Sequence, residues 1–286
     1  MSDTASTAPD VHPPKKIARQ ATSKGEKKAG LDLPVLVALG LLAGAYIAFG
    51  GLFALVALAG TSEAVPFGPA QVLAGVVFSL GLILVLVGGA ELFTGNTLLV
   101  VAWAEGRAGF APVLWALAVA YVTNFLGSVA IAALGFAAGV HLGGDGAVGV
   151  AALNLAERKV ELDFGTALAS GIAANMLVCL AVWLAFGARS AADKVLVIIP
   201  PIAAFVAMGL EHSVANMSLI PFAWMVQDLA APEFWVQAGL DPERSVIGLG
   251  GFIANLVAAT IGNVIGGGLV GAAYWFAYLR PKEEEG

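Results

Sequence analysis

The chain has 286 residues, of which 59% are hydrophobic and only 12% are charged, and its formal net charge at pH 7 is −6. This composition lies outside the range of a soluble domain of this length and within that of a protein that crosses a membrane several times. It excludes the basic surface that a nucleic-acid partner would need. One cysteine and three histidines are too few for a disulfide framework or a zinc site.

The N-terminal residues 1–30 are rich in Thr, Ser, Pro and Lys and contain almost no apolar run. This pattern predicts a disordered tail, and not a signal peptide, which would need an apolar stretch of its own. Residues 281–286 are expected to form a short C-terminal tail. The region 31–280 between them is predicted to be one membrane domain.

Six apolar segments follow in this region, and each is longer than the ~20 residues that a crossing requires. Six crossings place both termini on the same side of the membrane. All but three of the 14 lysines and arginines fall on that side, so the positive-inside rule predicts that both termini are cytoplasmic. The predicted spans cover residues 33–60, 68–104, 110–140, 164–187, 195–226 and 245–279.

The second and fifth spans share the pattern G-x-E-x-x-x-[GA]-N, at 89–96 and 209–216. A glutamate in the middle of a span is costly and indicates a functional site. The adjacent glycines and the length of each segment predict a half-helix, a loop and a second half-helix. Such a loop must line protein or a water-filled cavity, so the pattern indicates a solute pathway.

The duplication extends to the third and sixth spans, where 124–128 matches 263–267. Spans one to three (about 31–140) and four to six (about 160–280) are therefore predicted copies. Because three is odd, the second copy crosses in the opposite sense, and the two loops face each other near the middle. Half-helix N-termini that point inward favour an anion. The glycines at 266, 267, 268 and 271 are expected to allow close helix packing.

The stretches 89–98, 205–217 and 262–270 resemble the formate/nitrite transporter family over about 33–280. The stretches 174–180, 211–217 and 231–235 are most similar to its formate-channel branch. The resemblance implies an all-α, aquaporin-like protomer in a bacterial inner (plasma) membrane, assembled as a homopentamer with a pore in each protomer. It also implies small monovalent anions as substrates, namely formate, nitrite or hydrosulfide, and sometimes acetate or lactate.

The resemblance also assigns roles to residues of this chain by their position in the motifs. It implies a substrate pathway and a set of apolar constrictions. The pathway residues are Thr94, Lys159, Asn175 and His212, and the constriction residues are Phe78, Leu82, Leu92 and Phe205.

His212 is the only histidine inside an apolar span, and it is interpreted either as a buried structural residue or as a participant in transport. A dry site favours the neutral imidazole, and an arriving anion favours its protonation, so the entry of anion and proton would be coupled. The anion could then pass the constrictions as the neutral acid. Asn175 is expected to orient the ring. Thr94 offers a hydroxyl to the substrate, caps the next half-helix, or does both.

Glu91 and Glu211, with Asn96 and Asn216, are expected to structure the two loops, the carboxylates by accepting from loop backbone N–H groups. Lys159 belongs to a charged cluster that is either a solvated or snorkelling group or, as the resemblance implies, a funnel that attracts anions.

The sequence is thus interpreted as a proton-coupled formate transporter (a symporter) or anion channel, without enzymatic activity, catalytic residues, metal or cofactor. Nitrite or hydrosulfide is the alternative substrate within the same class. A neutral-solute pore of the aquaporin or ammonia type is a second alternative, against which the absence of N-P-A repeats counts. A membrane enzyme would need nucleophiles or metal ligands that converge on a site, and the sequence does not supply them.

Overall fold

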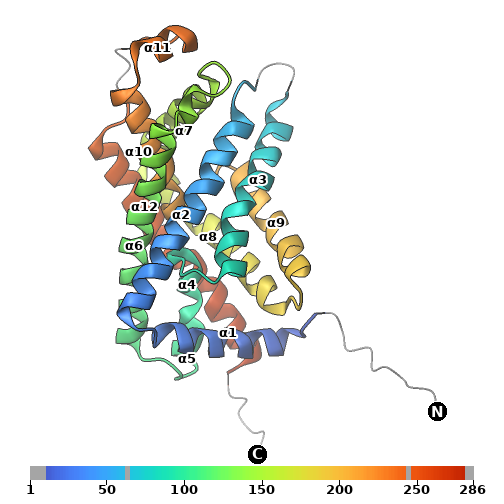
Figure 1. The fold of residues 1–286 in the computed structure, drawn as a ribbon. Helices are drawn as coiled ribbons and strands as arrows, with labels where there is room; N and C mark the ends of the chain where they lie inside the picture. Colours follow the sequence, from blue (N-terminus) through green and yellow to red (C-terminus); the bar gives the residue numbers. More distant parts are fainter. Residues whose placement is uncertain (1–10, 62–64, 243–245, 281–286) are drawn as a thin grey trace, which may run out of the picture.

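A computed structural model describes residues 11–61, 65–242 and 246–280, and within these residues the chain is helical without strands (Figure 1). The helix α1 (Pro14–Ala29) lies across one end of an upright bundle, and α11 (Pro232–Ala238) lies at the opposite end. We call these the α1 end and the α11 end. The first and last described helices both reach the α1 end, which agrees with an even number of crossings.

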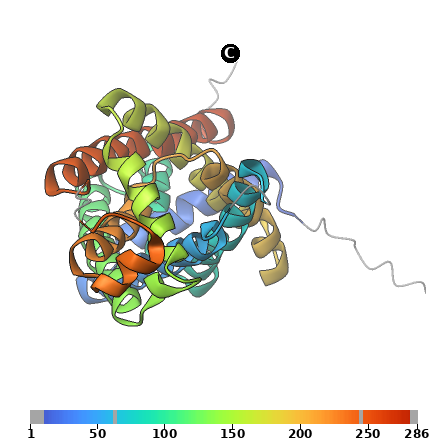
Figure 2. The same ribbon diagram turned by 90° about the horizontal axis from the view of Figure 1, so that it is seen from above.

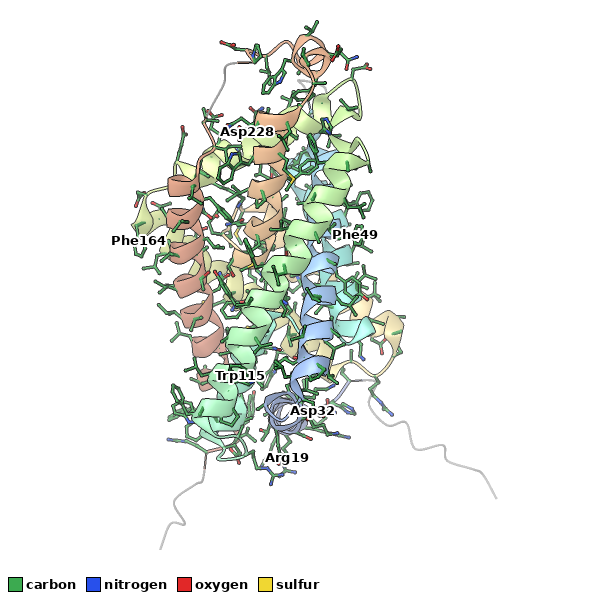
Figure 3. All side chains as sticks on the ribbon, turned by 60° about the vertical axis from the view of Figure 1, so that its left-hand side comes forward. Arg19, Asp32, Phe49, Trp115, Phe164 and Asp228 are labelled. Atoms are coloured by element: carbon green, nitrogen blue, oxygen red, sulfur yellow. The ribbon has the colours of Figure 1, made fainter. Side chains whose placement is uncertain are left out.

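Five of the described helices are long and apolar enough to span a membrane. Their side walls carry exposed apolar side chains, such as Phe49, Trp115 and Phe164 in Figure 3, whereas the charged Arg19 and Asp228 lie at opposite ends. This distribution suits a lipid environment around the middle of the bundle. The five helices are α2 (Leu33–Leu58), α3 (Phe67–Gly88), α6 (Phe110–Ala137), α8 (Phe164–Gly187) and α12 (Leu249–Tyr278).

The second and fifth predicted spans are both broken, as the sequence pattern predicts. After α3 the chain turns at Gly89 (φ 85°) and continues as α4 (Phe93–Asn96), the 3-10 turn η1 (Thr97–Leu99) and α5 (Val100–Ala104). Likewise α9 (Ala191–Ala207) ends before Gly209 (φ 66°), and α10 (Ser213–Leu229) follows. Both glycines adopt the left-handed conformation that side chains disfavour.

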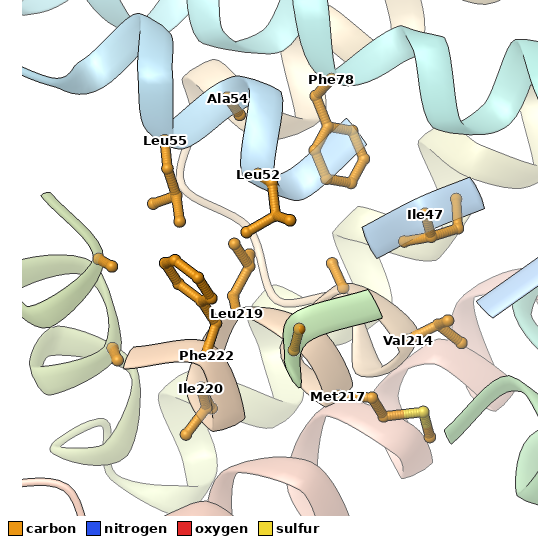
Figure 4. Close-up of a cluster of buried hydrophobic side chains, with 14 of the residues drawn as sticks. Ile47, Leu52, Ala54, Leu55, Phe78, Val214, Met217, Leu219, Ile220 and Phe222 are labelled. Atoms are coloured by element: carbon orange, nitrogen blue, oxygen red, sulfur yellow. The ribbon is translucent and has the colours of Figure 1, made fainter. Parts of the chain in front are cut away.

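The helix α10 is enclosed in the bundle, which Figure 2 shows end-on, and the close-up in Figure 4 shows part of its packing. Its side chains Val214, Leu219 and Phe222 pack against Ile47 and Leu52 of α2. Of the 17 residues of α10, 13 are buried, including the polar Ser213, Asn216 and Gln227. The second half of the fifth span is therefore surrounded by protein. On the α11 side it is covered by η2 (Val140–Leu142), α7 (Ala147–Val160) and α11.

The predicted disorder of residues 1–30 is wrong for residues 14–29, which form α1. Pro14 occupies the first helical position, where its missing N–H costs nothing. Ile17, Ala18 and Ala21 form a helical stripe that packs against Val101 and Trp183, while most of the lysines face outward. The apolar stripe is short, and the many charged residues around it make the composition of the whole segment polar. Residues 1–10 and the predicted tail 281–286 lie outside the described residues.

Glycines allow the first and last helix of each repeat to approach closely. A Cβ added to Gly44 of α2 would overlap the backbone of Asn124 in α6, and one added to Gly266 of α12 would overlap the carbonyl of Ile172 in α8. Gly268 is different, because its added Cβ meets nothing within 4 Å. The packing role predicted for the glycines of α12 is therefore wrong at Gly268.

This contrast gives a matched pair of variants within one helix. Gly266→Ala should destabilise the protein by about 1–3 kcal/mol, because the methyl group forces α8 and α12 apart. Gly268→Ala should leave stability unchanged or slightly higher. Thermal unfolding of both variants in mild detergent measures the difference, and equal melting temperatures would contradict this account of the packing.

Candidate functional site

The two breaks meet at a hydrogen bond between Thr94 and His212. Thr94 lies on α4 after the first break, and His212 is the N-cap of α10 after the second. Thr94 Oγ1 is 2.8 Å from His212 Nε2, and both side chains are buried. Residues that are 118 positions apart in the sequence thus form one contact in the middle of the bundle.

The second ring nitrogen of His212 determines the tautomer. His212 Nδ1 accepts the backbone N–H of Ala215 at 3.1 Å, so Nδ1 carries no hydrogen in this arrangement. The hydrogen of the neutral ring therefore lies on Nε2 and is donated to Thr94 Oγ1. The hydroxyl hydrogen of Thr94 is then available to another acceptor.

Each break is held by an asparagine from the third span of its own repeat. Asn124 Oδ1 accepts from the N–H of Phe93 at 2.8 Å, and Asn263 Oδ1 accepts from the N–H of Ser213 at 2.8 Å. Their Nδ2 groups donate to the carbonyls of Glu91 and Glu211, at 3.0 Å in both cases. The sequence motif that marked the repeat thus contains the residues that satisfy the broken backbone.

The carboxylates of the two breaks pair with side chains. Glu91 accepts from Lys28 Nζ at 3.0 Å and from Asn96 Nδ2 at 2.9 Å. The expectation that these carboxylates accept from loop backbone N–H groups is therefore wrong. A nearby lysine compensates a buried carboxylate better, because it supplies the opposite charge. Sequence reasoning missed Lys28 because it lies in the segment that was predicted to be disordered.

The carboxylate of the second break, Glu211, pairs with a more deeply buried lysine than Glu91 does. Glu211 accepts from Lys159 Nζ at 2.7 Å, from Asn216 at 2.6 Å and from Asn255 at 2.9 Å. Lys159 is only 8% exposed, so its interpretation as a solvated or snorkelling group is wrong. Asn255 had no sequence signal beyond being polar in an apolar span.

Asn175 has a different role from the expected one. Its Nδ2 lies 3.2 Å from the carbonyl of Thr94, 3.1 Å from Thr97 Oγ1 and 2.6 Å from the carbonyl of Asn263. The expected bond to the imidazole is not among the contacts of these described residues, and Thr94 and Ala215 orient the ring instead. Asn175 holds the backbone of α4 in place, together with Thr97, whose hydroxyl donates to the Thr94 carbonyl at 2.6 Å.

Two cavities approach the Thr94–His212 pair from opposite ends of the bundle. The cavity on the α1 side has a volume of about 300 Å³ and includes Leu82 and Leu92. The cavity on the α11 side has a volume of about 580 Å³ and includes Lys159 and His212.

Phe78 and Phe205 line the cavity on the α11 side, with ring centroids 5.6 Å apart in an edge-on contact. The four predicted constriction residues thus line the two cavities, two in each. Thr94 and Asn175 are not among the described lining residues of either cavity. Apolar side chains therefore lie on both sides of one buried polar contact.

Comparison with known proteins agrees with this architecture. Residues 15–276 match the family model described as formate/nitrite transporter. The chain is 40% identical to the formate channel FocA of Escherichia coli K12, over 96% of this chain and 97% of that one. It is 35% identical to a probable formate transporter of Methanothermobacter thermautotrophicus, over 93% and 97%. A solved structure described as a pentameric formate channel with formate bound superimposes with a TM-score of 0.82 at 37% identity, over 87% and 98%.

Proposed function

The chain belongs to the formate/nitrite transporter family, and on that premise we propose that it carries formate across a membrane through a pore in each protomer. The observation that carries the proposal is the buried hydrogen bond between Thr94 and His212, which lies between two cavities. It offers a hydroxyl and an imidazole to a small carboxylate at the point where water is excluded. The similarity to formate channels over nearly the whole chain supports formate as the substrate.

The side chains along the proposed path indicate how the negative charge of the substrate is accommodated. Arg158 and Lys159 line the cavity on the α11 side together with one carboxylate, Glu211, so its cationic lining residues outnumber the acidic one and favour anions there. The anion then meets the Thr94 hydroxyl hydrogen, which the tautomer of His212 leaves available. Desolvation of a bare anion at the apolar residues is costly, and this cost favours transfer of a proton to it.

The proposed proton coupling rests on the capping bond of His212. A second proton on the ring must go to Nδ1, and it displaces the bond from the Ala215 N–H. The negative charge of the substrate offsets this cost, so the ring becomes protonated only when the anion is near. The proton on Nε2 can then pass to Thr94 Oγ1 while the Thr94 hydroxyl proton passes to formate, which leaves as formic acid. The ring is left neutral with its hydrogen on Nδ1, and release of that hydrogen with uptake of one at Nε2 restores the bond from the Ala215 N–H.

Thr94→Ala should lower the formate flux about tenfold with assembly intact, because a hydrogen bond to a charged group is lost while packing is nearly preserved. Radiolabelled formate uptake into proteoliposomes measures the flux. Thr61→Ala is the control, since Thr61 is exposed and its hydroxyl donates to the carbonyl of Leu58. Unchanged flux in correctly assembled Thr94→Ala would leave Thr94 as a helix cap only.

Two alternatives are tested in the same vesicles. Nitrite and hydrosulfide have the same charge and similar size, and competition with formate at two pH values ranks them. A neutral-solute pore would conduct water or ammonia at rates independent of formate. The Lys159 and Thr94 side chains favour the anion.

The protein is further proposed to be a homopentamer in a bacterial inner membrane, with both termini cytoplasmic and residues 31–280 as the channel domain. The similarity to a pentameric channel supports the assembly, and the exposed apolar side walls offer a surface for it. Native mass spectrometry in mild detergent should show five copies. Monomers alone, under several gentle conditions, would contradict the assembly.

A further inference from the structure

A second polar cavity opens at the α1 end, beside the cavity of the substrate pathway. It has a volume of about 490 Å³ and lies between α1 and the connection from α8 to α9. Lys24, Leu86 and Phe186 line both cavities, so the two are neighbours. The pathway derived above does not use this cavity.

The walls of the cavity are fixed by backbone contacts. The N–H of His12 donates to the carbonyl of Gly187 at 3.0 Å. Ile17 of α1 packs so closely on Gly187 that a Cβ there would approach its Cδ1 to 2.8 Å. These contacts attach the start of α1 to the end of α8. The cavity between them is therefore lined by segments that the fold holds in place.

The charge in this cavity is of one sign. Lys24 and Lys194 line it together with the polar His12 and Gln20, and none of its described lining residues is acidic. Partial burial lowers the pKa of Lys24, and so do the positive charges of Lys194, Lys28 and Lys27. Lys24 Nζ lies over the ring of Phe186, 5.3 Å from its centroid, which holds the ammonium at the boundary of the two cavities. Lysines whose positive charges act on one another favour a bound anion between them.

We propose that this cavity binds a phosphate-bearing anion with two or more negative charges, through Lys24 and Lys194. A monovalent carboxylate would neutralise only one of the cations, and the volume exceeds what so small an anion fills. Phosphate oxygens accept from ammonium groups on both walls at once. Occupancy would then tie α1 to the start of α9, at the edge of the substrate pathway.

The first test is binding of inorganic pyrophosphate to the purified protein, by isothermal titration calorimetry in detergent. Lys24→Gln/Lys194→Gln should bind at least about tenfold more weakly than the wild type, because two charge-assisted contacts are lost. Lys15→Gln/Arg19→Gln is the matched control, since it removes two charges from the part of α1 that lines a different cavity. Three results would each overturn the proposal. They are no binding at all, binding that sodium chloride of equal ionic strength abolishes, and binding that both double variants lose equally.

A lipid headgroup carries the same phosphate chemistry, and nanodiscs separate the two sources. Pyrophosphate binding that is equal in neutral and in phosphatidylglycerol-containing discs identifies a soluble ligand. Binding that the anionic lipid displaces in the wild type, and only there, identifies the headgroup.

A second measurement rests on the proposed transport function. A polyanion at the edge of the pathway repels formate, so pyrophosphate on the α1 side of proteoliposomes should lower formate flux in the wild type and not in Lys24→Gln/Lys194→Gln. If the wild type carries no formate at all, the proposed function fails, while the calorimetric result still decides the binding site.

Discussion

His212→Asn should abolish the stimulation of formate uptake by acid while the protein still folds. Asparagine caps helices well, so it can replace Nδ1 as the acceptor of the Ala215 N–H, but it neither takes up nor delivers a proton at these pH values. The stimulated rate should fall on the order of a hundredfold, the lower end of what a positioned proton-transfer group contributes. Proteoliposomes with an imposed pH gradient, compared with protein-free liposomes, measure it.

Two further variants make this result specific. His212→Phe should lose both the stimulation and the cap, and so should also be less stable by about 1 kcal/mol. His12→Asn, at the α1 end and outside the membrane-spanning helices, should keep the wild-type pH dependence. If His212→Asn assembles and retains that dependence, proton transfer by this residue is refuted and its role is that of a helix cap.

Lys159→Met should destabilise the protein by about 3–5 kcal/mol, because it leaves the carboxylate of Glu211 buried without a counter-charge. The side chains of this pair are only 10% and 2% exposed. Arg107→Met removes the cation of an exposed pair with Glu26, whose side chains are 59% and 42% exposed, and should cost at most about 1 kcal/mol. Thermal unfolding in detergent compares the two variants.

The double variant Lys159→Met/Glu211→Gln tests the cause of this loss. It removes both charges and keeps an amide oxygen for Asn216 and Asn255, so it should be more stable than Lys159→Met alone. Lys159→Met and Arg107→Met of equal stability would show that the burial of the Glu211 pair has no energetic weight.

Both predictions depend on the same organisation of the two breaks. In each, a carboxylate, a lysine and an asparagine are held together, and a second asparagine from the third span of the repeat accepts from the first helical N–H. The two breaks differ in the residue that follows the glutamate. His212 follows Glu211 in one break and Leu92 follows Glu91 in the other. The scaffold is therefore duplicated, whereas the two copies contribute different side chains to the buried contact, Thr94 from one and His212 from the other.

The sequence by itself determined the class of the protein, the two breaks and the family. Apolar length and low charge require a bilayer, and a glutamate beside glycines within a span requires a loop that lines a path. These properties are local, so a single sequence displays them. The motif at 263–267 likewise revealed the repeat, because duplicated segments keep their spacing.

Only the tertiary structure decided which groups are the hydrogen-bond and ion-pair partners of these residues. The lysine that pairs with Glu91 comes from residue 28, and the acceptor for the Phe93 N–H comes from residue 124. Contacts over such separations leave no periodic trace in the chain. The same holds for Asn175, which faces the backbone of Thr94, and for the tautomer of His212, which follows from the position of the Ala215 N–H. The residue type determines what a side chain can donate or accept. The packing of helices that are distant in sequence determines which groups become its hydrogen-bond partners.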